Sequence, residues 1–158
     1  GKPGEGFKKF LKTLVSGRVS IGALSIGTAL GAYKMALKYS SERESFGKKI
    51  SKFQSISFKL ADMATKIEAS KLLVYHAAWM KDQGLDIIKE AAMAKLYASE
   101  TAMGVTSDAI QVLGGNGYIK ENQVERFYRD AKILEIGEGT SEIQRLIISR
   151  EILKKLRL

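Results

Sequence analysis

Apolar residues recur at steps of three and four along most of the chain, which is the period of an amphipathic α-helix. A first long helical segment is predicted where this period runs from Ile21 to Tyr39, a second helix from near Lys52 to Gln83–Gly84, and a third from about Asp86 to Leu113. Each helix has a stripe of residues that is expected to face inward. In the first helix this stripe consists of Ile21, Leu24, Thr28, Ala32, Met35 and Tyr39. In the second helix it consists of Ile56, Leu60, Met63, Ile67, Val74 and Ala78, and in the third helix of Ile87, Ala91, Ala94, Ala98, Ala102, Val105, Ala109 and Val112.

Glycines in the first helix lower its predicted stability. Each glycine costs about 1 kcal/mol of helix stability relative to alanine. Gly27 and Gly31 lie one turn apart on one face. We therefore expect another helix to pack closely against that face, where a side chain would not fit.

Beyond the third helix, glycine breaks the pattern twice. The run 114–117 predicts a turn, followed by a short helix around residues 123–130. A second break at 136–139 precedes a last helix that starts at Thr140 or Ser141, with Ser141 and Gln144 spaced as in a capping box. No segment is a convincing strand. The prediction is an all-α fold, an antiparallel four-helix bundle with additional short helices, over residues 7–158 after a linker-like stretch at 1–6.

Composition narrows the class of protein. The chain has 158 residues, 45% of them hydrophobic, which suits one domain with a real core. It has no cysteine, which removes disulfides and thiolate chemistry and fits a reducing compartment. The net charge of +9 is spread along the chain, which favours solvated helix faces. The longest uncharged stretch, 19–33, is shorter than the ~20 residues of a membrane span, so it predicts a buried helix.

Several kinds of site lack the residues they need. His76 is the only histidine, which argues against Ser-His-Asp triads and the paired Glu-x-x-His motifs of di-iron bundles. Placed in mid-helix beside Tyr75 and Trp79, it is expected to be a packing or surface residue. The glycine run at 114–117 has neither the preceding strand nor the last glycine of a dinucleotide fingerprint. No metal site is predicted.

Three glycine-bearing polar segments, at 42–54, 111–118 and 138–145, offer candidate chemistry. Arg43 can hold a phosphate with two hydrogen bonds, and the glycines at 114–117 let a backbone approach a ligand closely. Thr140 opens a helix whose free N–H groups favour an anion. Glu138 lies between Gly137 and Gly139, and this unhindered position suits a general base. Each feature alone also has an ordinary explanation: a surface ion pair, a helix stop or a solvated acid.

Together these segments resemble the acyl-CoA dehydrogenase family. The matching motifs are E-R-x-x-F-G-x-x-I-x-x-F-Q at 42–54, L-A-D-M at 60–63, A-A-M-A-K at 91–95, Q-V-L-G-G-N-G-Y at 111–118, R-D-A-K-I at 129–133 and E-G-T-S-E-I-Q-R at 138–145. The resemblance runs from about Gly4 to Leu153 and is to a short-chain, butyryl-CoA dehydrogenase-like C-terminal domain. Residues 1–6 then look like the remnant of a link from the family's middle β-domain.

The resemblance implies a flavin-dependent reaction of fatty acid β-oxidation. An acyl-CoA thioester is oxidised to the trans-2-enoyl-CoA, with Glu138 removing the α-proton while the β-hydrogen leaves as hydride to FAD. The thioester carbonyl would be polarised by a ribityl hydroxyl of FAD and by the backbone N–H of Glu138. Some branched-chain members carry the base on the first helix of this domain. The matching position here is near Gly17, which cannot act as a base, so the resemblance favours Glu138.

The resemblance also implies binding roles. Contacts with FAD are predicted for Arg43, Ser45, Phe46, Gln54, Thr140, Ser141 and Glu142. Contacts with the FAD of a neighbouring subunit are predicted for Gln111, Val112, Leu113, Gly114 and Gly115. Contacts with acyl-CoA are predicted for Tyr39, Ser40, Ser41, Glu42, Gly137 and Gly139. Most family members have tyrosine before the base, so Gly137 predicts a wider pocket, suited to branched or bulky acyl groups.

The implied partners are acyl-CoA and electron-transfer flavoprotein. The resemblance also implies a homo-oligomer (dimer or tetramer), whose copies are joined through the first and third helices. Neither nucleic acid nor a membrane span is expected. A bacterial cytoplasm is the expected location, with the mitochondrial matrix as the alternative. Without the family's N-terminal and middle domains, the fragment is expected neither to hold FAD tightly nor to turn over. The alternatives are a non-catalytic oligomerisation scaffold, an acyl-CoA oxidase domain and a basic module that binds nucleic acid.

Overall fold

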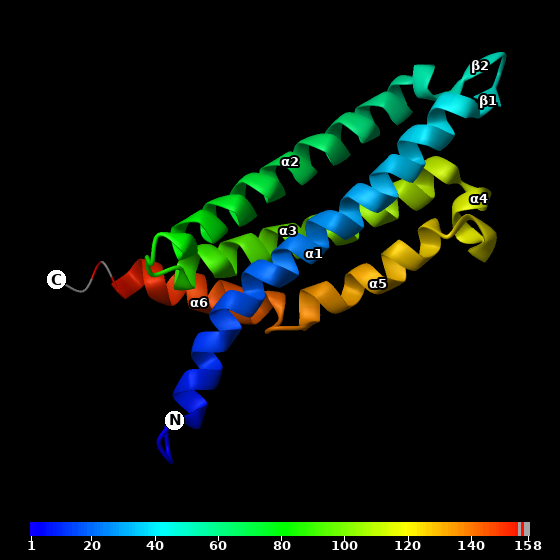
Figure 1. Cartoon of the computed structure of the whole chain (residues 1–158). Coiled ribbons are helices and arrows are strands. Elements are labelled where there is room, and N and C mark those ends of the chain that lie inside the picture. The colour runs from blue at the N-terminus through cyan, green and yellow to red at the C-terminus, as the bar shows by residue number, and fades with distance from the viewer. Residues whose placement is uncertain (155, 157–158) are drawn as a thin grey trace.

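The computed structural model describes residues 1–154 and 156, and these fold mainly into helices (Figure 1). Three helices are long: α1 (Gly6–Glu42), α2 (Gln54–Asp82) and α3 (Ile88–Leu113). The others are α4 (Gly115–Tyr118), α5 (Val124–Ile136) and α6 (Ser141–Lys154), with short 3-10 turns η1 (Ile50–Lys52) and η2 (Lys120–Asn122) and a hairpin of β1 (Glu44–Ser45) and β2 (Lys48–Lys49). The predicted all-α class is confirmed.

Helix α3 is the centre of the bundle, since α1, α2, α5 and α6 all contact it. The chain runs up α1, back along α2, up α3 and back along α5 (Figure 1). Helices α5 and α6 follow one another beside α3, so together they hold the fourth position of the predicted bundle. The predicted short helix at 123–130 is therefore too short, because α5 continues to Ile136. The break in this fourth position, residues 137–140, carries Glu138.

Small side chains bring α1 and α3 close together. The predicted inward stripe of α3 is buried throughout, from Ile87 to Val112, and α1 meets it with Ala29, Ala32 and Ala36. The prediction for Gly27 is wrong, because a Cβ there would meet nothing within 4 Å. Gly31 does pack closely, with its Cβ position 2.6 Å from the ring of Phe127 on α5. The close approach that glycine permits is thus confined to one of the two predicted positions.

The sequence predicts a turn around Phe46–Gly47, and the structure has one there, with φ of 50° at Phe46 and 74° at Gly47. The turn closes an antiparallel hairpin over residues 44–49, with Glu44 paired to Lys49 and Ser45 to Lys48. Two-residue strands are too short to show alternation, so no strand was expected there. Helix α2 begins at Gln54 rather than near Lys52. The glycine run, predicted as a turn, includes one turn of helix, α4, after Gly114 (φ 60°).

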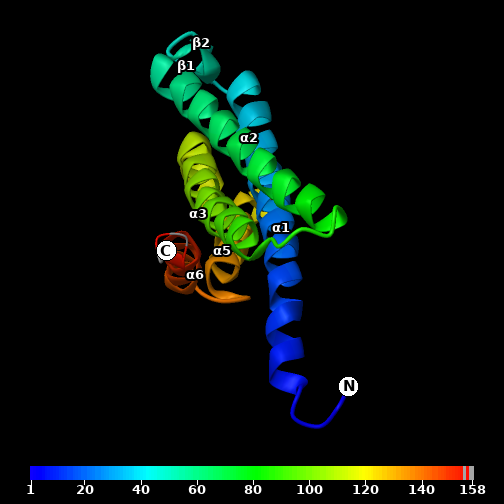
Figure 2. The same cartoon turned by 90° about the vertical axis from the view of Figure 1, so that its left-hand side faces the viewer.

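The predicted capping box at the start of α6 is wrong. The hydroxyl of Thr140, not Ser141, accepts the backbone N–H of Ile143, at 3.4 Å. Gln144 instead donates its side-chain amide to backbone carbonyls of the preceding loop. The spacing of Ile143, Leu146, Ile147 and Ile152 predicts that these residues continue an inward pattern along α6, but three of them, Ile143, Leu146 and Ile152, are exposed. Figure 2 shows α6 beside α5 at the edge of the bundle.

Helix α1 is long and apolar enough to cross a bilayer by length and composition alone. Its most apolar window has a mean hydropathy of 1.3, and 28% of that window is buried. In the structure α1 packs along α2, α3 and α5. Only its first turns extend away from the other helices (Figure 1).

Candidate active site

Glu138 lies in the loop between α5 and α6 in an unusual backbone conformation. Its φ is 58° and that of Gly139 is 97°, both in the left-handed region. A residue with a side chain adopts this region at a cost of about 1–3 kcal/mol and keeps it only where its surroundings fix it. Such strain is concentrated at functional sites. The conformation of the loop therefore marks Glu138 as a candidate functional residue.

Two buried side chains hold this loop, and sequence reasoning assigned neither to the site. Lys95 of α3 donates its ammonium group to the carbonyl oxygens of Glu135, at 3.0 Å, and Gly139, at 2.9 Å. Gln144 of α6 donates to the carbonyl oxygens of Glu138, at 3.2 Å, and Gly139, at 2.8 Å. Both side chains are fully buried. The signal that could have revealed Lys95 was a lysine within the predicted buried alanine face of its helix.

The carboxylate of Glu138 rests against α1. A Cβ placed on Gly17 would lie 2.6 Å from Oε2 of Glu138, so the carboxylate occupies the space that a side chain at position 17 would need. The two positions at which the family resemblance places a base are thus neighbours in space. With glycine at position 17, only Glu138 supplies a carboxylate there.

Arg18 and Lys95 bring positive charge to this carboxylate. Burial lowers the pKa of Arg18, and the charge of Glu138 acts in the opposite direction. Burial also lowers the pKa of Lys95, and the nearby Arg18 lowers it further, whereas Glu135, Glu100 and Glu138 act to raise it. Neither cation makes an ion pair with Glu138 within 4.0 Å among the described residues. The carboxylate therefore lies in a positive field without being neutralised by a direct contact.

Unsatisfied polar atoms gather around the same loop. Within the described residues, the buried side-chain atoms without a hydrogen-bond partner are Nε of Arg18, Oε2 of Glu138, Oγ of Ser141 and Oε1 of Gln144. A buried polar atom without a partner costs about 1–3 kcal/mol, and a native structure contains few of them. Their concentration around one carboxylate favours a site that contacts a ligand.

The predicted residues fall into two groups at opposite ends of the bundle. The group near the catalytic candidate consists of Gly137, Glu138, Gly139, Thr140, Ser141 and Glu142; the other consists of Tyr39, Ser40, Ser41, Glu42, Arg43, Ser45, Phe46, Gln54, Gln111, Val112, Leu113, Gly114 and Gly115. Gly17, which touches Glu138, and Glu42 are separated along α1 by 25 helical positions, or roughly 37 Å at the helical rise. One copy of the chain cannot gather both groups around a single reacting centre.

The far group is joined by contacts between distant segments. Asn116 of α4 donates to the hydroxyl of Tyr39 at 2.7 Å, which ties the glycine run to the end of α1. Arg43 is exposed and makes no ion pair within the described part of the chain, and Phe46 is 95% exposed. The side chains of Ser40, Val112 and Leu113 are buried, so these residues present at most their backbone to a ligand.

At the near group, Glu142 is held ionised at the start of α6. Hydrogen bonds from its own backbone N–H and from the Thr140 hydroxyl lower the pKa of the Glu142 carboxyl. A carboxylate is favoured at this end of a helix, where the backbone N–H groups are free. The site thus contains two carboxylates with different roles: Glu142 stabilises the helix terminus, and Glu138 points at α1.

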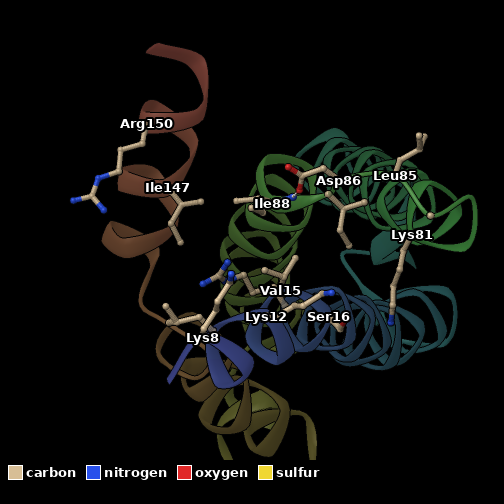
Figure 3. Close-up of a pocket in the computed structure, with 14 residues that line it drawn as sticks. Lys8, Lys12, Val15, Ser16, Lys81, Leu85, Asp86, Ile88, Ile147 and Arg150 are labelled. Carbon is tan, nitrogen blue, oxygen red and sulfur yellow. Dashed lines mark hydrogen bonds between the residues drawn. The ribbon is translucent and has the colours of Figure 1, made fainter. Parts of the chain in front are cut away.

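A cavity of about 860 Å³ opens near this end of the bundle (Figure 3). It is lined by the first turns of α1, the connection from α2 to α3, and α6. Figure 3 shows Val15, Ile88 and Ile147 among its apolar side chains and Lys8, Lys12 and Arg150 among its cations. Arg18 lines it as well, but the predicted binding residues do not.

Comparison with known proteins places the chain in a family. Residues 4–153 match the model of the acyl-CoA dehydrogenase C-terminal domain. The chain is 56% identical over 154 residues to the probable acyl-CoA dehydrogenase YngJ of Bacillus subtilis, an alignment that covers 98% of the chain and 40% of that relative. It is 51% identical over 155 residues to the caffeyl-CoA reductase–Etf complex subunit CarC of Acetobacterium woodii, covering 98% and 41%.

Solved structures agree. Butyryl-CoA dehydrogenase from Megasphaera elsdenii matches with a TM-score of 0.96 and 48% identity, over 97% of this chain and 40% of that one. A structure of PigA with FAD and proline matches with a TM-score of 0.93 and 34% identity, over 96% and 40%. The chain spans about 40% of the length of the relatives it matches. The chain belongs to the acyl-CoA dehydrogenase family, and its residues 4–153 correspond to the C-terminal domain of that family.

Proposed function

We propose that this chain is the C-terminal part of an FAD-dependent acyl-CoA dehydrogenase, which converts an acyl-CoA thioester to the trans-2-enoyl-CoA with Glu138 as the α-proton base. The observation that carries the proposal is the placement of Glu138. Its carboxylate is fixed against Gly17 by a loop in the left-handed conformation, among buried polar atoms that lack partners. Such a carboxylate is in place before substrate arrives, as a general base must be.

The residues around Glu138 have distinct tasks in this proposal. Oε2 of Glu138, which accepts no hydrogen bond within the described chain, receives the α-proton of the acyl group. Arg18 and Lys95 bring positive charge to the neighbourhood of this carboxylate. The backbone N–H of Glu138 donates to the thioester oxygen, where negative charge develops as the proton leaves.

The residues present fit a flavin dinucleotide. Arg43, exposed and without an ion pair, can bind a phosphate, and exposed Phe46 and Gly114 leave room for close contact. Thr140 and Ser141 lie at the start of α6, where backbone N–H groups favour an acceptor. FAD, when bound, supplies the acceptor for the hydride that leaves the β-carbon. The residues that would hold it are Arg43, Ser45, Phe46, Gln54, Gln111, Val112, Leu113, Gly114, Gly115, Thr140, Ser141 and Glu142.

The separation of the two residue groups supports a homo-oligomer. The group around Arg43 and Gly114 lies too far from Glu138 to serve the same cofactor within one copy. We therefore propose that it contacts the FAD of a neighbouring copy, in a dimer or tetramer. The parts that account for the remaining length of the relatives would complete the pocket, so the 158 residues alone are expected to bind FAD weakly and to be inactive.

Replacement of Glu138 tests the proposal. In the full-length enzyme that carries this chain, Glu138→Gln is expected to lower the turnover of short-chain acyl-CoA by about 10²–10⁴-fold, because the amide cannot accept the proton. Absorbance of bound flavin should be unchanged. Glu68→Gln, on an exposed face of α2, is the control and should keep wild-type turnover. Wild-type turnover in Glu138→Gln would contradict the proposal. If the wild-type enzyme loaded with FAD is itself inactive, the non-catalytic scaffold becomes the better explanation.

The electron acceptor separates a dehydrogenase from an oxidase. We propose electron-transfer flavoprotein as the acceptor, supported by the relative that is named as a subunit of a complex with Etf. Turnover should then require this protein or an artificial acceptor. Rapid turnover with oxygen alone, with stoichiometric hydrogen peroxide, would identify an acyl-CoA oxidase instead.

A further inference from the structure

Lys95 bridges the two ends of the break that carries Glu138. Its ammonium group donates to the carbonyl of Glu135, in the last turn of α5, and to the carbonyl of Gly139, just after Glu138. Carbonyls in the last turn of a helix have no partner within the helix, and a cation is favoured there. Lys95 therefore satisfies an acceptor on each side of Glu138 from a helix, α3, that lies at the centre of the bundle.

Gln144 fixes the peptide between Glu138 and Gly139. Its amide nitrogen donates to the carbonyl oxygens of both residues, at 3.2 and 2.8 Å. The orientation of that peptide determines ψ of Glu138 and φ of Gly139. With Lys95 on the carbonyl of Gly139 as well, the two loop carbonyls of Glu138 and Gly139 and the helix-end carbonyl of Glu135 are held by two fully buried side chains. Rotation of the loop out of the left-handed region would break these hydrogen bonds.

We propose that Lys95 and Gln144 are positioning residues, which hold the Glu138 loop in its left-handed conformation so that the carboxylate stays against Gly17 and the backbone N–H keeps its direction. The inference rests on the proposed function of Glu138 as the base. Neither side chain touches the reacting atoms, and both act through the loop backbone. A displacement of about 1 Å at a catalytic group can lower a rate by about 10²-fold.

The ammonium group of Lys95 is buried among charged groups of the site. These groups are Arg18 on α1, Glu100 on its own helix, Glu135 on α5 and Glu138 in the loop. Burial lowers the pKa of Lys95, and its ammonium group donates to two carbonyl oxygens at 2.9 and 3.0 Å. Loss of the ammonium group removes this donor from the carbonyl oxygens of Glu135 and Gly139, so the loop loses its hydrogen bonds to α3. A residue with only a packing role would not have this effect.

The test compares Lys95→Met, Lys95→Arg and Gln144→Met in the full-length enzyme loaded with FAD. Lys95→Met keeps the length of the side chain but removes its hydrogen bonds and its charge. We expect kcat to fall by about 10–100-fold with KM changed by less than about threefold. Lys95→Arg keeps hydrogen-bond donors at this position and should recover part of kcat. Gln144→Met should also lower kcat at a nearly unchanged KM, because it releases the same loop.

Lys89→Met, on the same helix but paired with Glu90 away from the loop, is the control and should leave kcat and KM unchanged. A lower melting temperature in Lys95→Met with wild-type kcat would overturn the proposal, since it would leave a structural role only. If Lys95→Met does not fold, wild-type kcat in Gln144→Met overturns it. Failure of the proposed function is recognised separately, because Glu138→Gln would then retain wild-type turnover.

Discussion

At the scale of the residue, the site depends on a strained backbone and a missing side chain. Glu138 occupies the left-handed region, and its carboxylate lies where a side chain at position 17 would be. Gly17 cannot itself act as a base, but it has a second effect on the site. It leaves the space that the Glu138 carboxylate fills, so the two residues form one structural unit across α1 and the loop.

Gly17→Ala should separate catalysis from stability. The new methyl group would lie 2.6 Å from Oε2 of Glu138, the movable end of a side chain, so the carboxylate is expected to shift while the helix remains intact. We expect kcat to fall by about 10-fold or more and the melting temperature to stay or rise, since alanine favours a helix by about 1 kcal/mol over glycine. Gly27→Ala, with nothing within 4 Å of its new Cβ, is the control and should keep wild-type kcat. Equal kcat values in the two variants would show that Gly17 has no such role.

Gly137 is expected to influence acyl preference. Its φ of −60° is accessible to any residue, and a Cβ there would meet only the carbonyl of Ile133, at 3.4 Å. Gly137→Tyr should therefore fold and narrow the pocket beside the base. We predict a lower kcat/KM for branched acyl-CoA relative to straight short-chain acyl-CoA. Competition between the two substrates measures this ratio directly, and an unchanged ratio would refute the idea of a wider pocket.

At the scale of the element, close packing of α1 holds α5, and hence the start of the Glu138 loop. Gly31 of α1 lies against the ring of Phe127 on α5. Gly31→Ala would place a methyl group 2.6 Å from that ring, and we expect a net loss of unfolding free energy of about 1–2 kcal/mol from overpacking. Urea denaturation should reveal it. Gly104→Ala on α3, which meets nothing within 4 Å, should instead be neutral or stabilising.

The sequence predicted most helices because their apolar period is long, although α1 begins earlier than predicted, at Gly6, and exposes Leu24 of its predicted inward stripe. The inward stripe of α3 is buried throughout, and the end of α2 at Gln83–Gly84 agrees with its C-cap. The errors lie where a few residues decide the structure. The hairpin at 44–49 is too short for a periodic signal, and Gln144 resembled a capping residue although its amide binds the Glu138 loop. Contacts of this kind depend on tertiary structure, which spacing alone does not contain.

At the scale of the whole molecule, the bundle separates Glu138, the proposed base, from most of the predicted cofactor residues. The motif around Glu138 and its identity as a candidate were predicted from the sequence, but the distance between the two groups was not. Arg43 and Gly114 were assigned from motifs, and motifs carry no information on which copy of the chain they serve. The arrangement along α1 supports the proposal that neighbouring copies complete one another's sites.

The central claim is that Glu138 removes the α-proton of an acyl-CoA. Exchange of that proton in D₂O, followed by NMR of a bound acyl-CoA analogue that cannot be oxidised at the β-carbon, measures this step without the redox reaction. The wild-type full-length enzyme should replace the α-hydrogen with deuterium, and Glu138→Gln should slow the exchange by about 10²-fold or more while still binding the analogue. Exchange at the wild-type rate in Glu138→Gln would contradict the account.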